Sequence, residues 1–175
     1  MAIVTNVECR TLPDFATAYT WSVKMVKPPL GLSVPDKFNT ICKTSTIPKR
    51  EANAGAELVL HGHKRKLPGV EFSAGQLTLT FADLVDNRVR SFIRQWRELN
   101  HENQTGVAVP YMAAYATIQI TLQNRLGVDT YRYVLHNCWC EDHDFGTELV
   151  EGTDTVLFDS VQMMISYDHF DEFEL

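Results

Sequence analysis

Residues 116–123 read Ala-Thr-Ile-Gln-Ile-Thr-Leu-Gln, an unbroken alternation of apolar and polar side chains. This period of two predicts a β-strand with one face in a core and the other face toward solvent. The same alternation recurs in residues 19–25, 77–81, 131–139 and 161–167. Strands that bury only one face are typical of antiparallel sheets, so the chain is expected to be mainly β.

Two further strands are predicted at residues 38–46 and 57–66, which brings the total to about seven. Val156 and Phe158 have the opposite phase to Val161 and Met163, so a β-bulge is expected between Phe158 and Val161. The predicted architecture is an antiparallel β-sandwich or barrel.

One segment has a helical period instead. Between Asp86 and Leu99 the apolar residues recur at i, i+3, i+4, i+7 and i+10, which predicts one amphipathic helix beside the sheet. Asp83 or Asp86 is expected to accept free amide hydrogens at its start, and Asn100 to close its end. A second face carries Arg90, Arg94 and Arg97; acids lie beside it and no aromatic residue interleaves, which favours solvent or protein contact over nucleic-acid binding.

The chain has 175 residues, of which 45% are hydrophobic and 22% are charged, values typical of ordinary globular proteins. This length suits a single domain, residues 1–175. No apolar run reaches the roughly 18 residues that a membrane span needs, and residues 1–10 do not look like an export signal. No membrane contact is expected.

Charge is distributed unevenly along the chain. The net charge is −6, which argues against a dedicated reader of duplex DNA. Residues 141–175 hold 11 of the 22 acids and no lysine or arginine, and residues 171–175 are expected to form an acidic C-terminal tail. Residues 37–66 hold seven of the 16 bases. Segments of opposite sign in one chain are consistent either with solvated loops or with head-to-tail self-association.

Residues 48–68 contain few large apolar side chains and are predicted to form a protruding β-hairpin arm. Ordering such an arm costs conformational entropy, so we expect another copy of the chain to hold it. Residues 57–63 would offer an edge for strand addition. The candidate contact residues between subunits are Arg50, Glu51, Glu57, His61, His63, Lys64, Arg65 and Lys66.

The chain contains none of the common nucleophile, phosphate-binding or metalloprotease motifs, so no enzymatic activity and no cofactor are expected. Its four cysteines (Cys9, Cys42, Cys138 and Cys140) are too few for a disulfide scaffold, and buried thiols are the favoured interpretation. Cys138, Cys140 and His143 could supply at most three zinc ligands, and the paired CxxC motifs of common zinc sites are absent, so a metal site is not favoured. Whether any cysteine joins two subunits stays open.

The order of these features resembles a known family. The segment Cys42-Lys43-Thr44-Ser45-Thr46-Ile47-Pro48 precedes an arm that returns through residues 62–69. Next come a Thr-rich strand and a helix that starts at Asp86-Asn87 and carries Trp96. They are followed by the 131–139 strand and by a closing segment from Asp154-Thr155 to Tyr167-Asp168. Over about residues 18–170 the chain resembles the tail tube proteins of contractile-tailed bacteriophages. The tube initiators of baseplates and the tube subunits of related injection machines are similar too.

The resemblance implies a structural subunit of a virion. Hexameric rings would stack head to tail into a hollow tube that conducts DNA from capsid to host, inside a contractile sheath. The implied partners are further copies of the chain, the sheath protein, the tape measure protein, baseplate and tail terminator proteins, and, transiently and non-specifically, DNA. Assembly in the host cytoplasm is implied as well. Host, tube length, and whether this is the repeating or the initiating subunit stay open.

A conduit for a polyanion functions best when its wall does not retain phosphates, so we expect a net negative lumen. The candidate polar residues for the lining are Thr117, Gln119, Thr121, Gln123, Gln162, Ser166 and Asp168. The alternation does not decide which strand face lines the lumen. Two alternatives from other classes remain. One is a monomeric small-ligand β-barrel of the lipocalin type, and the other is a zinc-dependent hydrolase that uses Cys138, Cys140, His143 and a nearby acid.

Overall fold

The computed structural model describes residues 20–52, 55–61, 63–67, 69, 71–82, 86–100, 110–146 and 161–175. Within these ranges the chain is mainly β, as predicted from the alternating segments. The elements in chain order are β1 (Trp21–Lys27), α2 (Phe38–Ile41), β2 (Cys42–Ser45), β3 (Glu51–Ala52), β4 (Glu57–Leu60), β5 (His63–Lys66), β6 (Glu71–Phe72), β7 (Gly75–Phe81), α3 (Arg88–Asn100), α4 (Tyr111–Ala114), β8 (Ala116–Gln123), β9 (Asp129–Asp144), β10 (Val161–Tyr167) and β11 (His169–Glu174).

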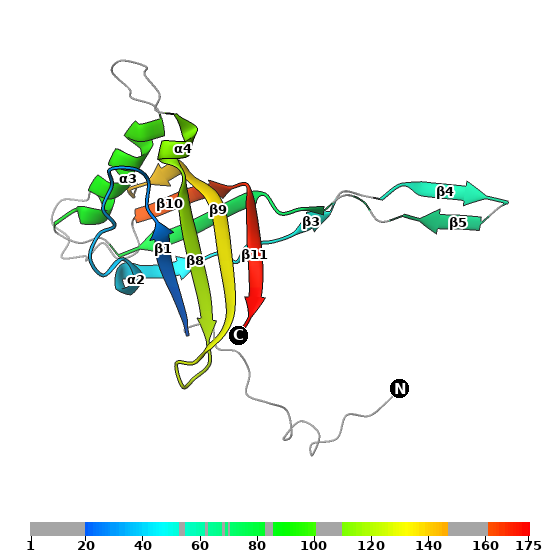
Figure 1. Cartoon of the computed structure of the whole chain (residues 1–175), viewed down its shortest axis with the longest axis horizontal. Helices are drawn as coiled ribbons and strands as arrows, with labels where there is room; N and C mark the ends of the chain where they lie inside the picture. Colours follow the sequence, from blue (N-terminus) through cyan, green and yellow to red (C-terminus); the bar gives the residue numbers. More distant parts are fainter. Residues whose placement is uncertain are drawn as a thin grey trace.

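Seven of these strands form one antiparallel sheet with the order β1-β8-β9-β10-β7-β2, and β11 pairs with β9 beside this path. Strand β9 is long enough to serve two halves of the sheet. Its first part pairs with β8 and β11, and its last part pairs with β10. Asn137, with φ of 52°, lies between these two parts, so the strand turns there toward its second set of partners. Figure 1 shows β1, β8, β9 and β11 side by side.

The apolar faces of the strands and helix α3 enclose one core. In β7 and β10 every second side chain is buried, as the period of two predicts. Val89, Phe92, Ile93 and Trp96 of α3 are buried against the sheet, which confirms the predicted amphipathic helix. The indole nitrogen of Trp96 donates a hydrogen bond to the carbonyl oxygen of Ala114 at 2.8 Å, which joins α3 to α4.

Helix α3 begins and ends close to the predicted boundaries. The backbone amide of Arg88 donates to Oδ1 of Asp86 at 3.3 Å, as expected for a capping residue, while Asp83 lies outside the described residues. Asn100 is the last helical residue, and its side-chain amide donates to the carbonyl oxygen of Cys140 instead of closing the helix. None of the helices in the described ranges is long and apolar enough to cross a membrane.

Two predicted strands were wrong in detail. Residues 38–41 form helix α2, and only residues 42–45 are a strand. Phe38 and Ile41 are both buried, and their i, i+3 spacing suits one helical turn rather than a strand that would point them to opposite faces. Residues 57–66 are not one strand but the hairpin β4–β5, which turns at His61 with φ of 48°.

The C-terminal residues also differ from the prediction. Residues 171–175 were expected to be an acidic tail, but residues 169–174 form β11, which pairs with β9 in regular register. Backbone pairing along β9 and burial of Phe170 hold this segment in spite of its charge. The predicted bulge between Phe158 and Val161 lies outside the described residues.

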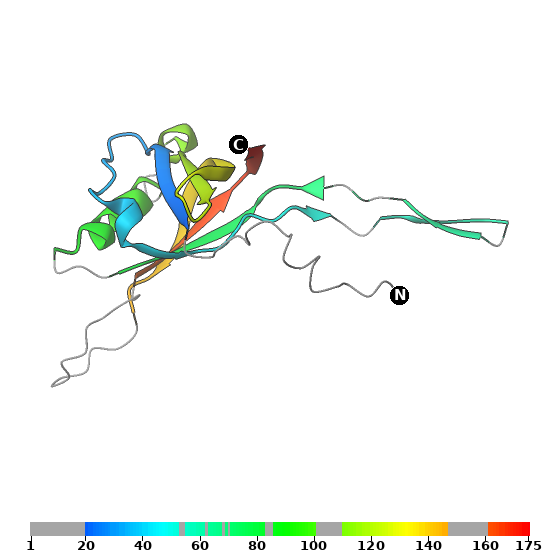
Figure 2. The ribbon, with the colours of Figure 1, turned by 90° about the horizontal axis from the view of Figure 1, so that it is seen from below.

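The arm extends far from the rest of the chain (Figures 1 and 2). It leaves the sheet after β2, passes through β3 to the hairpin β4–β5, and returns through β6 to β7. Its described part therefore extends beyond the predicted range of 48–68. The short pairs β3–β6 and β4–β5 are sheets of their own, separate from the seven-stranded sheet.

Candidate functional site

The far end of the arm is a highly charged hairpin. All four residues of β5 are exposed, and three of them are the cations Lys64, Arg65 and Lys66. On the facing strand Glu57 lies opposite Lys66, and its Oε2 is 3.8 Å from Nζ of Lys64. One carboxylate therefore faces three cations, and the arm end keeps a positive excess.

The base of the arm is attached to β11. Nε of Arg50 lies 3.2 Å from Oε1 of Glu172, and its guanidinium carbon lies 5.7 Å from the ring centre of Phe170. Glu51, another predicted contact residue, pairs with Phe72 in the β3–β6 ladder. The structure thus divides the predicted arm residues into a base that contacts the body and an end that projects from it.

Next to the arm base is an open pocket of about 440 Å³. Tyr167 and Gly75 are in contact in its wall, since a Cβ at Gly75 would lie 2.6 Å from the hydroxyl oxygen of Tyr167. The pocket is lined by Thr46, Ile47, Lys49, Glu51, Ala74, Gly75, Gln76, Thr78 and Tyr167. Its lining carries both charge signs and gives no apolar cavity for a small ligand.

The four predicted lumen residues of β8 lie on one strand face. Lys24 of β1 is opposite Gln119, and Arg132 of β9 is opposite Thr121, so both cations share this face. Thr121 is buried and accepts a hydrogen bond from the side chain of Gln119 at 3.1 Å. Asp171 of β11 is opposite Val134, so this face also carries one acid beside the two cations. These charges do not establish a net negative lumen, which stays a prediction.

The other three predicted lumen residues belong to a different region. Gln162 and Ser166 lie on β10, opposite Thr80 and Gln76 of β7, and Asp168 lies at the bend between β10 and β11. Ser166 donates a hydrogen bond to Oε2 of Glu141. The structure does not bring these residues together with the four predicted lumen residues of β8. The alternation within each strand could not show that the two groups lie in different halves of the sheet.

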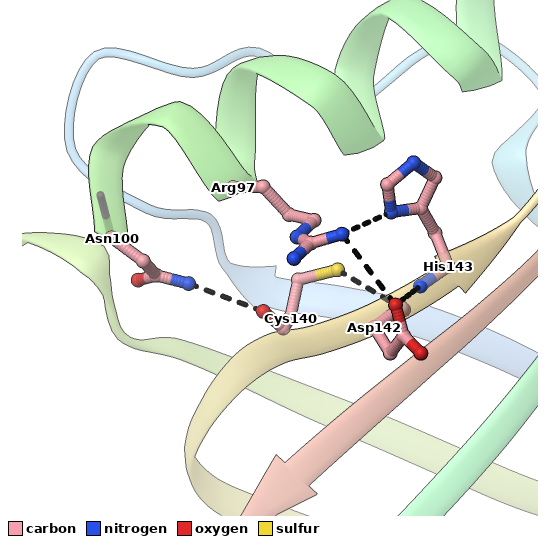
Figure 3. Close-up of polar contacts among 5 residues, drawn as sticks. All are labelled: Arg97, Asn100, Cys140, Asp142 and His143. Carbon is pink, nitrogen blue, oxygen red and sulfur yellow. Dashed lines mark hydrogen bonds and ion pairs between the residues drawn. The ribbon is translucent and has the colours of Figure 1, made fainter. Parts of the chain in front are cut away.

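A polar cluster joins the C-terminal end of α3 to β9 (Figure 3). Nη1 of Arg97 donates to Nδ1 of His143 at 2.5 Å and lies 3.5 Å from Oδ1 of Asp142. Asn100 donates to the carbonyl oxygen of Cys140 at 3.2 Å. The cluster borders a pocket of about 450 Å³ lined by Arg94, Arg97, Glu98, Asn100, Trp139, Cys140, Glu141, His143 and Phe145.

His143 must be neutral to accept the hydrogen bond from Arg97. Burial lowers the pKa of His143, and the positive charge of Arg97 lowers it further, while Asp142 and Asp144 raise it. A histidine whose pKa is lower in the folded state contributes stability above its ordinary pKa, and this contribution is lost as the pH falls through the folded-state pKa. Acid is therefore expected to weaken the attachment of α3 to β9.

We predict that His143→Gln makes the melting temperature depend less on pH between about pH 7 and pH 5, because glutamine still offers an acceptor but does not titrate. Differential scanning calorimetry across this range measures the effect. His63→Gln, on the exposed strand β5, is the matched control. Equal pH slopes in the wild-type protein and His143→Gln would contradict the prediction.

Three of the four cysteines are free and buried, as the favoured interpretation predicted, and Cys9 lies outside the described residues. Burial raises the pKa of the thiols of Cys42, Cys138 and Cys140 to about 12. The thiolate, which is the reactive form, is therefore scarce at neutral pH. In the described part of the chain, no three His, Cys, Asp or Glu side chains are grouped so as to hold a metal ion.

The acidic strand β11 was missed by the sequence analysis. Its residues His-Phe-Asp-Glu-Phe-Glu contain only Phe170 as a buried side chain, so the apolar alternation that identified the other strands is absent. The contact between Arg50 and Glu172 spans 122 residues and has no local signal either. The one sequence feature that agrees with this contact is that the arm and the C-terminal segment carry net charges of opposite sign.

No protein-family model matches the chain, and neither does any curated protein. Solved structures do share its fold. A chain of the anti-feeding prophage cap, a tube-terminating cap, is 13% identical with a TM-score of 0.65, covering 94% of this chain and 95% of its own. A chain of the baseplate of the anti-feeding prophage is 14% identical with a TM-score of 0.65, covering 93% and 98%.

A third structure is the sheath-tube complex of an extracellular contractile injection system, PVC, in its extended state. One of its chains is 15% identical with a TM-score of 0.62, and the alignment covers 99% of this chain and 100% of the other. At these identities the comparison establishes a shared fold over nearly the full length. The fold is thus one found in chains of contractile injection systems.

Proposed function

We propose that the chain is a structural, non-enzymatic subunit of the tube of a contractile tail. Copies would form hexameric rings, and the rings would stack head to tail into a hollow conduit inside a contractile sheath. The observation that carries this proposal is the arm: β4 and β5 project away from the body in a fold found in tube-associated particles (Figure 2). An isolated two-stranded hairpin is marginally stable in water, so a neighbouring copy would stabilise it.

Within this class the proposal follows the resemblance to bacteriophage tail tubes. The tube would conduct DNA, with the sheath, tape measure, baseplate and tail terminator proteins as partners, in a virion assembled in the host cytoplasm. A baseplate tube initiator and the tube subunit of an injection system are the alternatives. The latter is supported by the particles from which the similar structures come.

A monomeric small-ligand barrel is less well supported. Such a protein needs an enclosed apolar cavity. In the described residues the space between sheet and α3 is filled by Leu77, Leu79, Phe81, Ile93 and Trp96, none of which is exposed. The two pockets described above are both lined by charged side chains.

Electron microscopy and sedimentation of the purified protein test the proposal. Long hollow rods are the expected result for a repeating tube subunit, and isolated rings for a tube initiator. A protein that sediments as a monomer at every concentration, and shows neither rods nor rings, would overturn the proposed function.

The arm gives a prediction at the level of residues. Replacing Lys64, Arg65 and Lys66 together by glutamate reverses the exposed charge of β5 and is expected to prevent the stacking of rings, because like charges then face any acidic partner surface. The fraction of protein in sedimenting polymers measures the effect. Lys43→Glu, an exposed change on β2, is the control, and normal polymerisation of the triple variant would exclude electrostatic docking of the arm.

A further inference from the structure

Strand β11 presents an acidic edge to which the structure assigns no partner strand. It contains Asp171, Glu172 and Glu174 and no lysine or arginine. Among the described strands it pairs only with β9, so its second edge has no described strand beside it. Such an edge offers free backbone donors and acceptors together with negative charge.

The same strand already binds a cation from its own chain. Arg50 lies against Glu172 at 3.2 Å and over the ring of Phe170. The hydroxyl of Tyr131 donates to the other oxygen of Glu172 at 2.5 Å, so this carboxylate is fully engaged. The half of β11 beyond it is exposed. Phe173, which is 47% exposed, lies on the face of Asp171, and Glu174 lies on the opposite face with Glu172.

Strand β5 is the complementary element. It presents Lys64, Arg65 and Lys66, all exposed, on a hairpin whose outer edge has no described strand beside it. The hairpin points away from the β11 of its own copy (Figures 1 and 2). Any β11 that it reaches must therefore belong to a second copy.

We propose that β11 is the docking strand for the arm of another copy, with β5 lying along the acidic edge of β11. This inference rests on the proposed function and names the surface that receives the arm. Side chains alternate between the two faces of a strand, so Lys64 and Lys66 share one face of β5 and would meet Glu174. Arg65, on the other face, would meet Asp171 and lie over the ring of Phe173, as Arg50 lies over Phe170. Arm and docking strand are different surfaces, so the contact is heterologous and propagates from copy to copy.

A charge exchange tests this assignment. The arm variant is Lys64→Glu/Arg65→Glu/Lys66→Glu, and the docking variant is Asp171→Lys/Glu174→Lys. The docking variant leaves Glu172 unchanged but removes the contact of Asp171 with Nε2 of His136 at 3.1 Å, so Glu174→Lys alone, which keeps this contact, is measured beside it. We expect each variant alone to lower the association constant by at least about tenfold, which corresponds to about 1.4 kcal/mol. Combining both sets in one chain, or mixing the two variants in equal amounts, is expected to restore polymers, because opposite charges then meet again.

Sedimentation velocity and electron microscopy provide the readout, and circular dichroism verifies that each variant is folded. If the docking variant polymerises like the wild-type protein while the arm variant does not, the docking strand is wrong and the proposed function stands. Failure of both the combined chain and the mixture to polymerise would also overturn the assignment. If the wild-type protein forms no rings or rods, the proposed function itself fails.

Discussion

Trp96→Ala is expected to destabilise the protein by about 3–5 kcal/mol, the usual cost of truncating a large buried aromatic side chain. Trp96 is completely buried, its ring centre lies 5.8 Å from that of Phe92, and its indole nitrogen donates to Ala114. The variant would leave a cavity between α3 and the sheet and would also leave the carbonyl oxygen of Ala114 without this donor. Equilibrium unfolding in urea measures the loss.

Two controls separate volume from hydrogen bonding. Trp96→Phe keeps much of the volume but removes the donor, so about 1–3 kcal/mol is expected. Arg94→Ala changes an exposed residue of the same helix and is expected to alter stability by less than about 0.5 kcal/mol. A loss below about 1 kcal/mol for Trp96→Ala would mean that α3 does not pack as described.

Gly55→Ala is expected to abolish assembly while leaving the body folded. A Cβ at position 55 would lie 1.6 Å from the backbone carbonyl oxygen of Leu67, a distance that no side chain tolerates. The adjacent hydrogen bond from the amide of Leu67 to the carbonyl oxygen of Ala56, 2.9 Å long, would have to break as the strands separate. Because this clash lies in the arm, the core and its unfolding free energy are expected to change by less than about 0.5 kcal/mol.

Sedimentation measures assembly, and urea unfolding measures the stability of the body. Ala56→Ser, an exposed change at the next position, is the control and is expected to assemble normally. If Gly55→Ala forms polymers with the wild-type yield, an ordered hairpin is not needed for assembly.

The elements with a strong local period were predictable from the sequence. The alternation in β8 and β10 and the i, i+3, i+4 stripe of α3 each arise from one buried face, so residue type alone reveals them. Helix α2 was not predictable because four residues hold a single turn, and β-branched and aromatic residues there also suit a strand. Strand β11 was hidden because backbone pairing rather than apolar burial holds most of it.

The protruding hairpin was predictable from the sequence, but the contacts at its base were not, and the role of its residues between subunits stays a prediction. The scarcity of large apolar residues identified the arm correctly, because a hairpin that leaves the body has no core to fill. The attachment of Arg50 to Glu172 depends on the three-dimensional arrangement of two distant segments, which residue spacing does not encode. For the same reason the alternation identified the polar residues of β8 and of β10, but it did not reveal that the two strands lie in different halves of the sheet.

Strand β9 also determines how the molecule can come apart. Its residues supply hydrogen bonds to β8 and β11 at one end and to β10 at the other, so neither half of the sheet has a complete ladder without it. Partial opening of one half would expose amides of the shared strand and weaken the other. The body is therefore built to unfold cooperatively, while the hairpin beyond β3 and β6 can lose its structure at little cost to the rest.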